Sequence, residues 1–124
     1  MIYYGKQNIN QEDIDSVIDV LKSDFLTQGP KVPEFEADLQ KYCQVKYAKV
    51  VSNATAALHL AYLAVGLKKE DIVWTSPNTF VSTANAALFC GATVDFVDID
   101  LQTFNMSVDS LEKKLIQAKK DKKL

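Results

Sequence analysis

The sequence contains no arginine: all 14 basic residues are lysine, set against 16 acidic residues, for a formal net charge of −2. Arginine is the side chain that holds carboxylates and phosphates with two parallel hydrogen bonds, so a chain without it must bind anions through backbone N–H groups, hydroxyls or lysine. This charge balance offers no large basic surface. We therefore expect no nucleic-acid partner.

The chain also lacks long apolar runs, and none approaches the ~20 residues that a membrane span needs. Its first residues do not have the basic-then-apolar order of a signal peptide, which favours a cytoplasmic protein with no membrane association. The single histidine, His59, has no ligand set near it, and we expect a structural role for it. Cys43 and Cys90 lie far apart and are predicted to be reduced core thiols. The aspartates 95, 98 and 100 favour an edge or loop-capping role, so no metal site is predicted.

The first 46 residues have the pattern of helices joined by a loop. Asn10 is a good N-cap, and apolar residues recur after it at three- and four-residue steps, which predicts a helix over residues 11–23. The loop 25–33 contains one glycine and two prolines, and Pro33 is placed to open a second helix.

From residue 47 onward, strand-like and helix-like segments alternate. Residues 47–52, 72–76 and 94–99 are β-rich, while residues 54–65 and 78–90 have helical patterns, each followed by a glycine, and Ser107 precedes a last helix. This alternation predicts an α/β fold with a mostly parallel sheet and crossover helices. At 124 residues the chain is long enough for one compact core.

The stretch VSNATAALHL, residues 51–60, lies where a predicted strand passes into a helix. In an open α/β sheet this edge binds ligands, and the unpaired N–H groups and positive dipole end of a helix suit a phosphate. Small alanines would let the anion approach, and Thr55 would add a hydroxyl. The alternative is that Ser52 or Asn53 simply caps the helix. No glycine-rich fingerprint or P-loop is present.

A second junction, WTSPNTFVSTANAAL (residues 74–88), holds the same position in the repeat. It should bring four residues to the same edge of the sheet: Asn78, Thr79, Phe80 and Ser82. Phe80 would face the crevice unless it is tucked into the core. A phosphate cradle beside an aromatic platform suits a flat, phosphorylated heteroaromatic cofactor.

Three runs carry a family resemblance: VSNATAALHLAYLAVGL, VWTSPNTFVSTANAALFCGATVDFVDID and LTQGPKVPEFE. They resemble the sugar-nucleotide aminotransferases of the DegT/DnrJ/EryC1/StrS type, which use pyridoxal 5'-phosphate (PLP). Within that family, the sequences of these runs are most similar to those of the branch that aminates the C4 ketone of a UDP-linked dideoxy keto-sugar on the route to pseudaminic acid. The resemblance implies the fold type I large domain. Residues 1–124 would be one incomplete domain, with amino-terminal helices and loop over 1–46 and the start of the PLP-binding part over 47–124.

The resemblance also implies roles for single residues. Ala54 and Thr55 match positions that hold the cofactor phosphate, and Phe80 matches the aromatic that stacks on the pyridine ring. Thr27, and more weakly Tyr4, resemble positions near the sugar-nucleotide pocket.

The family's catalytic groups have no match in this chain. Its members carry, further along, a lysine that forms a Schiff base with PLP and an acid that pairs with the pyridine nitrogen. We therefore expect an amino-terminal fragment with no catalytic residue of its own, inactive by itself. The complete enzyme would use an amino donor such as glutamate and a UDP-keto-sugar, and would be a homodimer.

Three alternatives stay open. A sugar-nucleotide dehydratase is a sibling activity on the same scaffold, distinguished by the residue at the lysine position. A non-enzymatic interaction or regulatory α/β module would have no affinity for the cofactor phosphate. A generic nucleotide-binding domain would favour a nucleotide over PLP.

Overall fold

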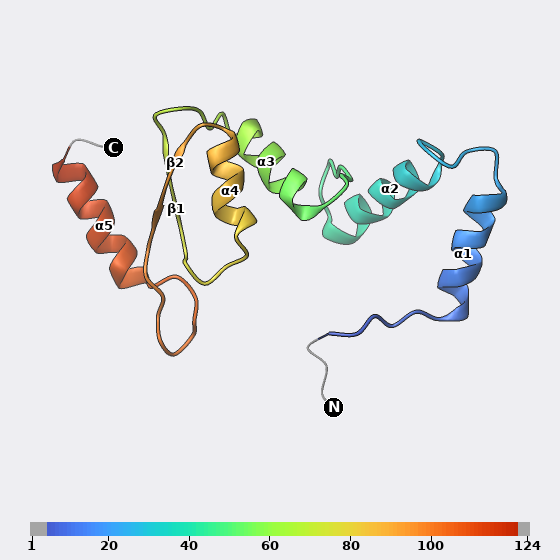
Figure 1. The fold of residues 1–124 in the computed structure, drawn as a ribbon, viewed down its shortest axis with the longest axis horizontal. Helices are drawn as coiled ribbons and strands as arrows, with labels where there is room; N and C mark the ends of the chain where they lie inside the picture. The colour runs from blue at the N-terminus through green and yellow to red at the C-terminus, as the bar shows by residue number, and fades with distance from the viewer. Residues whose placement is uncertain (1–4, 122–124) are drawn as a thin grey trace. The chain divides into compact units, whose positions relative to one another are not determined.

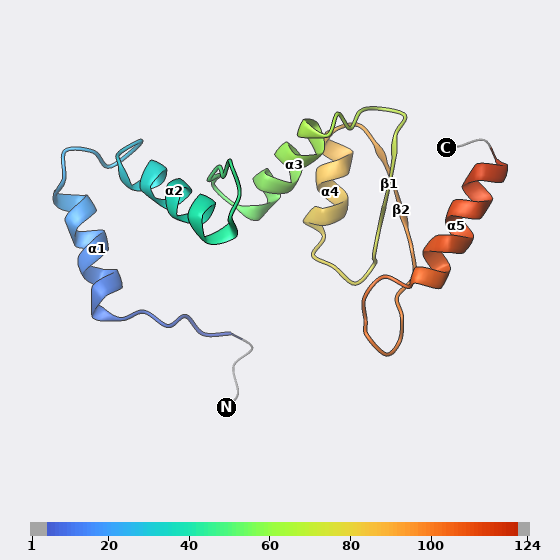
Figure 2. The ribbon, with the colours of Figure 1, turned by 180° about the vertical axis from the view of Figure 1, so that it is seen from behind.

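The computed structural model describes residues 5–121, and the chain divides into two compact units whose boundary falls between Val50 and Val51. Figures 1 and 2 show the elements in chain order from opposite sides. Within the described residues, no helix has the length and apolar character needed to cross a membrane. The two units are built differently, and each is described separately.

The first unit opens with helix α1, Gln11–Lys22, which begins at a reciprocal cap. The Asn10 side chain accepts a hydrogen bond from the Asp13 N–H at 3.1 Å, and the Asp13 carboxylate accepts from the Asn10 N–H at 2.9 Å. Two N–H groups that the first turn would leave open are thus satisfied. The predicted helix is confirmed, except that Ser23 serves as its C-cap.

Helix α2, Lys31–Cys43, begins two residues before Pro33, which occupies the third helical position. Proline is tolerated there because it lacks a backbone N–H, and N–H groups in the first turn of a helix have no carbonyl within the helix as a partner. Neither α1 nor α2 has a buried residue. Cys43 is exposed, so its prediction as a core thiol is wrong, because α2 has no buried residue and none of residues 5–50 covers its end. Cys43 and Cys90 are both free thiols.

The predicted strand over residues 47–52 does not form. Instead, the Glu36 carboxylate accepts hydrogen bonds from Lys49 Nζ at 2.7 Å and from the Val50 N–H at 3.1 Å, and these contacts hold the pKa of Glu36 below its ordinary value. A strand requires a neighbouring strand to receive its backbone groups. Within the described residues the two strands of the sheet pair only with each other, which leaves this segment without one.

The second unit contains a parallel pair of strands, β1 (Ile72–Thr75) and β2 (Thr93–Phe96), with Ile72 opposite Thr93. Helix α4, Ser82–Phe89, is the crossover between them and packs on both strands and on α3, Ala54–Ala64. Most of the buried core lies here, formed by small or branched residues: Ala86, Ala87, Ala92 and Val97. The predicted α/β fold, with a parallel sheet and a crossover helix, is confirmed.

Glycines end both central helices as predicted: Gly66 follows α3 with φ +81°, and Gly91 follows α4 with φ +78°. The start of α4 differs from the prediction, because residues 78–81 form a turn before Ser82. Polar side chains bond locally in this turn: the Asn78 N–H donates to Ser76 Oγ at 3.3 Å, and Thr79 Oγ1 lies 3.0 Å from Thr83 Oγ1. Such bonds compete with the helical backbone.

Helix α5, Val108–Lys120, follows the Ser107 cap as predicted, and β1 and β2 lie between it and α4 (Figure 1). Lys114 joins α5 to the sheet through an ion pair with Asp95 at 2.6 Å and a hydrogen bond to the Phe96 carbonyl at 2.7 Å. In the loop before α5, the Asp100 carboxylate accepts from both the N–H and the hydroxyl of Thr103. The capping role of Asp100 is confirmed.

Candidate functional site

The amino termini of α3 and α4 are joined by a hydrogen bond between two hydroxyls. Thr55, the second residue of α3, places its Oγ1 atom 2.8 Å from the Oγ atom of Ser82, the first residue of α4. Both helices begin at the end of the unit where β1 finishes (Figures 1 and 2). Two positive dipole ends therefore converge at the carboxyl edge of the sheet.

The start of α3 keeps two backbone donors open. The Asn53 side chain accepts from the Ala56 N–H at 2.9 Å, and the Asn53 carbonyl accepts from the Ala57 N–H at 3.1 Å. No group of residues 5–121 accepts a hydrogen bond from the N–H of Ala54 or Thr55. The first turn also carries no acidic residue. Asn53 is thus a cap, as the simpler alternative held, and the terminus still offers two N–H donors to an anion.

Phe80 lies in the turn that leads into α4 and is 72% exposed, so it is not part of the core. Its carbonyl accepts from the Thr83 N–H at 3.0 Å, which ties the turn to the helix. Asn78 Nδ2 donates to the Phe104 carbonyl at 3.2 Å and anchors the turn from the other end. An exposed ring on an anchored turn is suited to stack against a flat ligand.

Ala54, Thr55 and Phe80 all lie in the second unit, and the Thr55–Ser82 hydrogen bond joins the two segments that carry them. Thr27 is exposed in the loop between α1 and α2 of the first unit, beside a cavity of about 310 Å³ whose lining includes Gln28 and Gly29. Tyr4 lies outside the described residues. Sequence reasoning placed Ser82 at this edge without giving it a role. Its contact with Thr55 joins residues 27 positions apart, and no sequence pattern predicts such a contact.

Two other residues have structural surroundings. The His59 ring meets the Phe89 ring edge-on, with 5.6 Å between centroids, which fits the packing role expected of it. Trp74 is half-buried, and Lys114 Nζ lies 5.4 Å from its ring centroid. None of the described residues forms a cluster suited to a metal ion.

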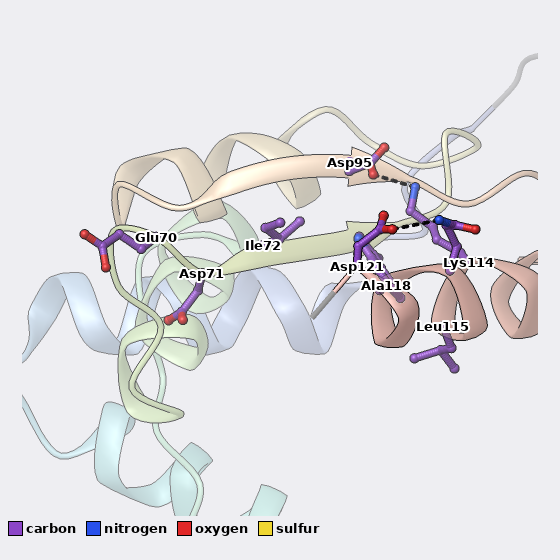
Figure 3. Close-up of a pocket in the computed structure, with 10 residues that line it drawn as sticks. Glu70, Asp71, Ile72, Asp95, Lys114, Leu115, Ala118 and Asp121 are labelled. Atoms are coloured by element: carbon purple, nitrogen blue, oxygen red, sulfur yellow. Dashed lines mark hydrogen bonds and ion pairs between the residues drawn. The ribbon is translucent and has the colours of Figure 1, made fainter. Parts of the chain in front are cut away.

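A separate cavity of the second unit lies between the strands and α5 (Figure 3). It measures about 850 Å³ and is lined by acidic and apolar side chains together with Lys114. Figure 3 shows the Asp95–Lys114 ion pair at its rim. None of the predicted site residues lines this cavity.

Comparison with known proteins decides the family. Residues 7–121 match the model of the DegT/DnrJ/EryC1/StrS aminotransferase family. The chain belongs to this family. It is 50% identical over 121 residues to UDP-4-amino-4,6-dideoxy-N-acetyl-beta-L-altrosamine transaminase of Campylobacter jejuni strain 81-176, covering 98% of this chain and 32% of that protein. The chain thus spans about a third of the length of that curated relative.

Solved structures agree with this assignment. A sugar aminotransferase, Spr1654 of Streptococcus pneumoniae, matches in its PLP form with a TM-score of 0.85 and 33% identity, over 90% of this chain and 29% of that one. Helicobacter pylori PseC, described as an aminotransferase of pseudaminic acid biosynthesis, matches with a TM-score of 0.81 and 35% identity, over 90% of this chain and 30% of its own. The fold is therefore the amino-terminal part of a fold type I PLP aminotransferase.

PLP is the cofactor of this family, and Spr1654 has been solved in both its PLP and its pyridoxamine phosphate forms. The residues at the amino termini of α3 and α4 fit this cofactor. The open N–H groups of Ala54 and Thr55 suit its phosphate, and the exposed ring of Phe80 suits its aromatic ring. Because the chain has no arginine, such backbone and hydroxyl donors, together with lysine, are the groups it can offer to that phosphate.

Proposed function

We propose that this chain is the amino-terminal part of a PLP-dependent enzyme that aminates the C4 ketone of a UDP-linked dideoxy keto-sugar. One observation carries the proposal: two open backbone donors at the start of α3 and the exposed Phe80 ring belong to segments joined by the Thr55–Ser82 hydrogen bond. The 50% identity with a UDP-sugar transaminase supports the substrate class, and the likeness to PseC supports a place in pseudaminic acid synthesis.

The chain's own residues bind and orient in this proposal. The N–H groups of Ala54 and Thr55, with the Thr55 hydroxyl, hold the cofactor phosphate at the positive end of α3. Phe80 would stack against the cofactor ring and help to orient it. When bound, PLP supplies an electron sink for moving the amino group. Thr27, and more weakly Tyr4, are proposed to lie near the sugar nucleotide.

The 124 residues are proposed to be one incomplete domain, with 1–46 as its amino-terminal segment and 47–124 as the start of its PLP-binding part. The relatives supply the reason: the chain covers 32% of the C. jejuni transaminase. In the complete enzyme, a Schiff-base lysine, an amino donor such as glutamate and a second subunit are proposed to complete the reaction. The complete enzyme is proposed to be cytoplasmic, and the chain alone is proposed not to transaminate.

The first test is the intact mass of the protein purified from its native source, with a visible absorption spectrum after PLP is added. We expect a mass several times 13.8 kDa and the absorption band of PLP bound to a lysine. A protein of 13.8 kDa with no such band would contradict the proposal that these residues serve within a whole aminotransferase.

The second test assays that complete protein with a UDP-linked 4-keto sugar and glutamate, and follows products by mass spectrometry. Formation of the 4-amino sugar with release of 2-oxoglutarate is the expected result. Loss of a sugar hydroxyl without gain of nitrogen would instead identify the dehydratase sibling. Residues 1–124 alone serve as the matched control and should yield no amino sugar.

A further inference from the structure

Ser82 is a buried polar residue to which neither the comparisons nor the proposed function assigns a role. It is 7% exposed, and its hydroxyl has a single hydrogen-bond partner among the described residues, Thr55 Oγ1 at 2.8 Å. Thr55 likewise has no other side-chain hydrogen bond within residues 5–121. The two hydroxyls therefore form an isolated pair.

The direction of this hydrogen bond follows from burial. If Thr55 donated to Ser82, the Ser82 proton would have no acceptor among the described residues, and a buried donor without a partner is unfavourable. If Ser82 donates to Thr55, its own proton is satisfied. The Thr55 proton is then free to be donated to another acceptor. The second arrangement leaves no buried donor unmatched.

We infer that Ser82 is a positioning residue that, by donating to Thr55 Oγ1, holds the Thr55 hydroxyl as an outward donor to the cofactor phosphate. The inference rests on the proposed function, because it needs the phosphate to lie at the start of α3. It adds a third donor to the two backbone N–H groups of that site, a hydroxyl oriented by the neighbouring helix.

The chain offers a matched control for the loss of a contact between these helices. Tyr62 Oη donates to the Thr83 carbonyl at 3.2 Å and so also joins α3 to α4, without touching Thr55. Tyr62→Phe removes that hydroxyl just as Ser82→Ala removes the other. If Ser82 only helps the helices to pack, both variants should have similar effects on every measurement.

The experiment measures affinity for pyridoxamine 5'-phosphate, which has no aldehyde and so cannot form Schiff bases with the 14 lysines. Unphosphorylated pyridoxamine is the second probe. Removal of one oriented hydrogen bond should weaken pyridoxamine phosphate binding by Ser82→Ala about 3- to 10-fold. Pyridoxamine binding should stay unchanged, and Tyr62→Phe should match the unaltered protein with both probes.

A double-mutant cycle separates an effect that passes through Thr55 from a general one. Thr55→Val should also weaken pyridoxamine phosphate binding, and adding Ser82→Ala to it should produce no further loss. Thermal unfolding of each variant, followed by circular dichroism, confirms that it is folded.

The possible failures are distinguishable. If Thr55→Val weakens binding and Ser82→Ala does not, the positioning role is wrong and the phosphate site remains. Equal losses in Ser82→Ala and Tyr62→Phe, or equal losses for both probes, would also overturn the positioning role. If Thr55→Val itself leaves pyridoxamine phosphate affinity unchanged, the placement of the phosphate in the proposed function fails as well.

Discussion

Helices α3 and α4 begin at the same edge of the sheet, yet their first turns differ in which backbone N–H groups are hydrogen-bonded. α3 begins after an extended Asn53 whose side chain caps one N–H and leaves those of Ala54 and Thr55 open. α4 begins from a helical Val81; the N–H groups of Thr83 and Ala84 donate to the carbonyls of Phe80 and Val81, and among the described residues only the N–H of Ser82 in this first turn has no acceptor. The start of α3 thus keeps two open donors for an anion, while the start of α4 keeps one and follows a turn that presents an aromatic ring.

We infer from this difference that a helix terminus is suited to bind an anion through the N–H groups that its cap leaves unpaired. Position at the carboxyl edge is common to both helices, so position alone does not decide. The turn that leads into α4 is stabilised by hydrogen bonds among its own residues, which suits it to hold the Phe80 ring in place for stacking. In α3 the extended entry exposes the backbone, which suits an anion. Changes to each terminus should therefore affect different properties of the protein.

The largest effect is expected from Ala54→Glu. A carboxylate in the first turn should stabilise α3 slightly through the helix dipole, by about 0.3–1 kcal/mol. The same charge should repel the phosphate and weaken pyridoxamine phosphate binding by roughly 100-fold or more. Isothermal titration calorimetry and urea unfolding measure the two effects. Ala61→Glu, an exposed position further along α3, is the control and should leave affinity unchanged.

The next largest effect is expected from Phe80→Ala. Loss of an aromatic contact should weaken binding of pyridoxamine and of its phosphate alike, by about 3- to 10-fold. Because the ring is 72% exposed, the free energy of unfolding should barely change. Titrations with both probes check this. A loss confined to the phosphorylated probe would contradict the division of roles between the two helices.

A smaller effect is expected from Asn53→Ala, which removes the cap of α3. The free energy of unfolding should fall by about 1 kcal/mol, as for other lost N-caps. Pyridoxamine phosphate affinity should stay close to that of the unaltered protein, because the N–H groups of Ala54 and Thr55 are not capped by Asn53. Urea unfolding and calorimetry provide the comparison. A large loss of affinity with unchanged stability would show that Asn53 contacts the ligand.

The smallest effect concerns the loop that supports the α4 turn through the Phe104 carbonyl. Hydrogen bonds from the N–H and hydroxyl of Thr103 and from the Gln102 N–H hold the pKa of Asp100 below its ordinary value of 3.8. A lowered pKa means that the carboxylate's contribution to stability is present above about pH 3.8 and is lost as pH falls through the folded-state pKa.

The Thr103 amide resonance should therefore move as the pH falls below 3.8, and Asp100→Asn should abolish that movement. NMR spectra recorded from pH 5 downward test this. A Thr103 shift that persists in the variant would assign the titration to another group.

The sequence alone was enough to predict elements whose signals are local. Asn10, Asn53 and Ser107 cap helices as expected, and Gly66 and Gly91 end them, because caps and positive φ angles depend on neighbouring residues. The junction between β1 and α4 follows from strand–helix alternation, but the strand expected before α3 does not form. The sequence leaves Phe80 open between the crevice and the core, and the structure shows it exposed.

The features that could not be predicted depend on distant partners. The strand expected over 47–52 does not form because no neighbouring strand is available to pair with it among the described residues. Instead, the Val50 N–H in this segment donates to the Glu36 carboxylate. The late start of α4 reflects competition from the Asn78 and Thr79 side chains. The Thr55–Ser82 pair requires α3 and α4 to pack, which no short pattern encodes.

The central claim is that the open end of α3 binds the phosphate of the cofactor. The most direct test titrates pyridoxamine phosphate into the 15N-labelled chain and follows each backbone amide by NMR. We expect saturable shifts at Ala54, Thr55 and Phe80, with pyridoxamine moving Phe80 alone. Shifts spread over the lysine-rich surface, with none at Ala54 or Thr55, would contradict the claim.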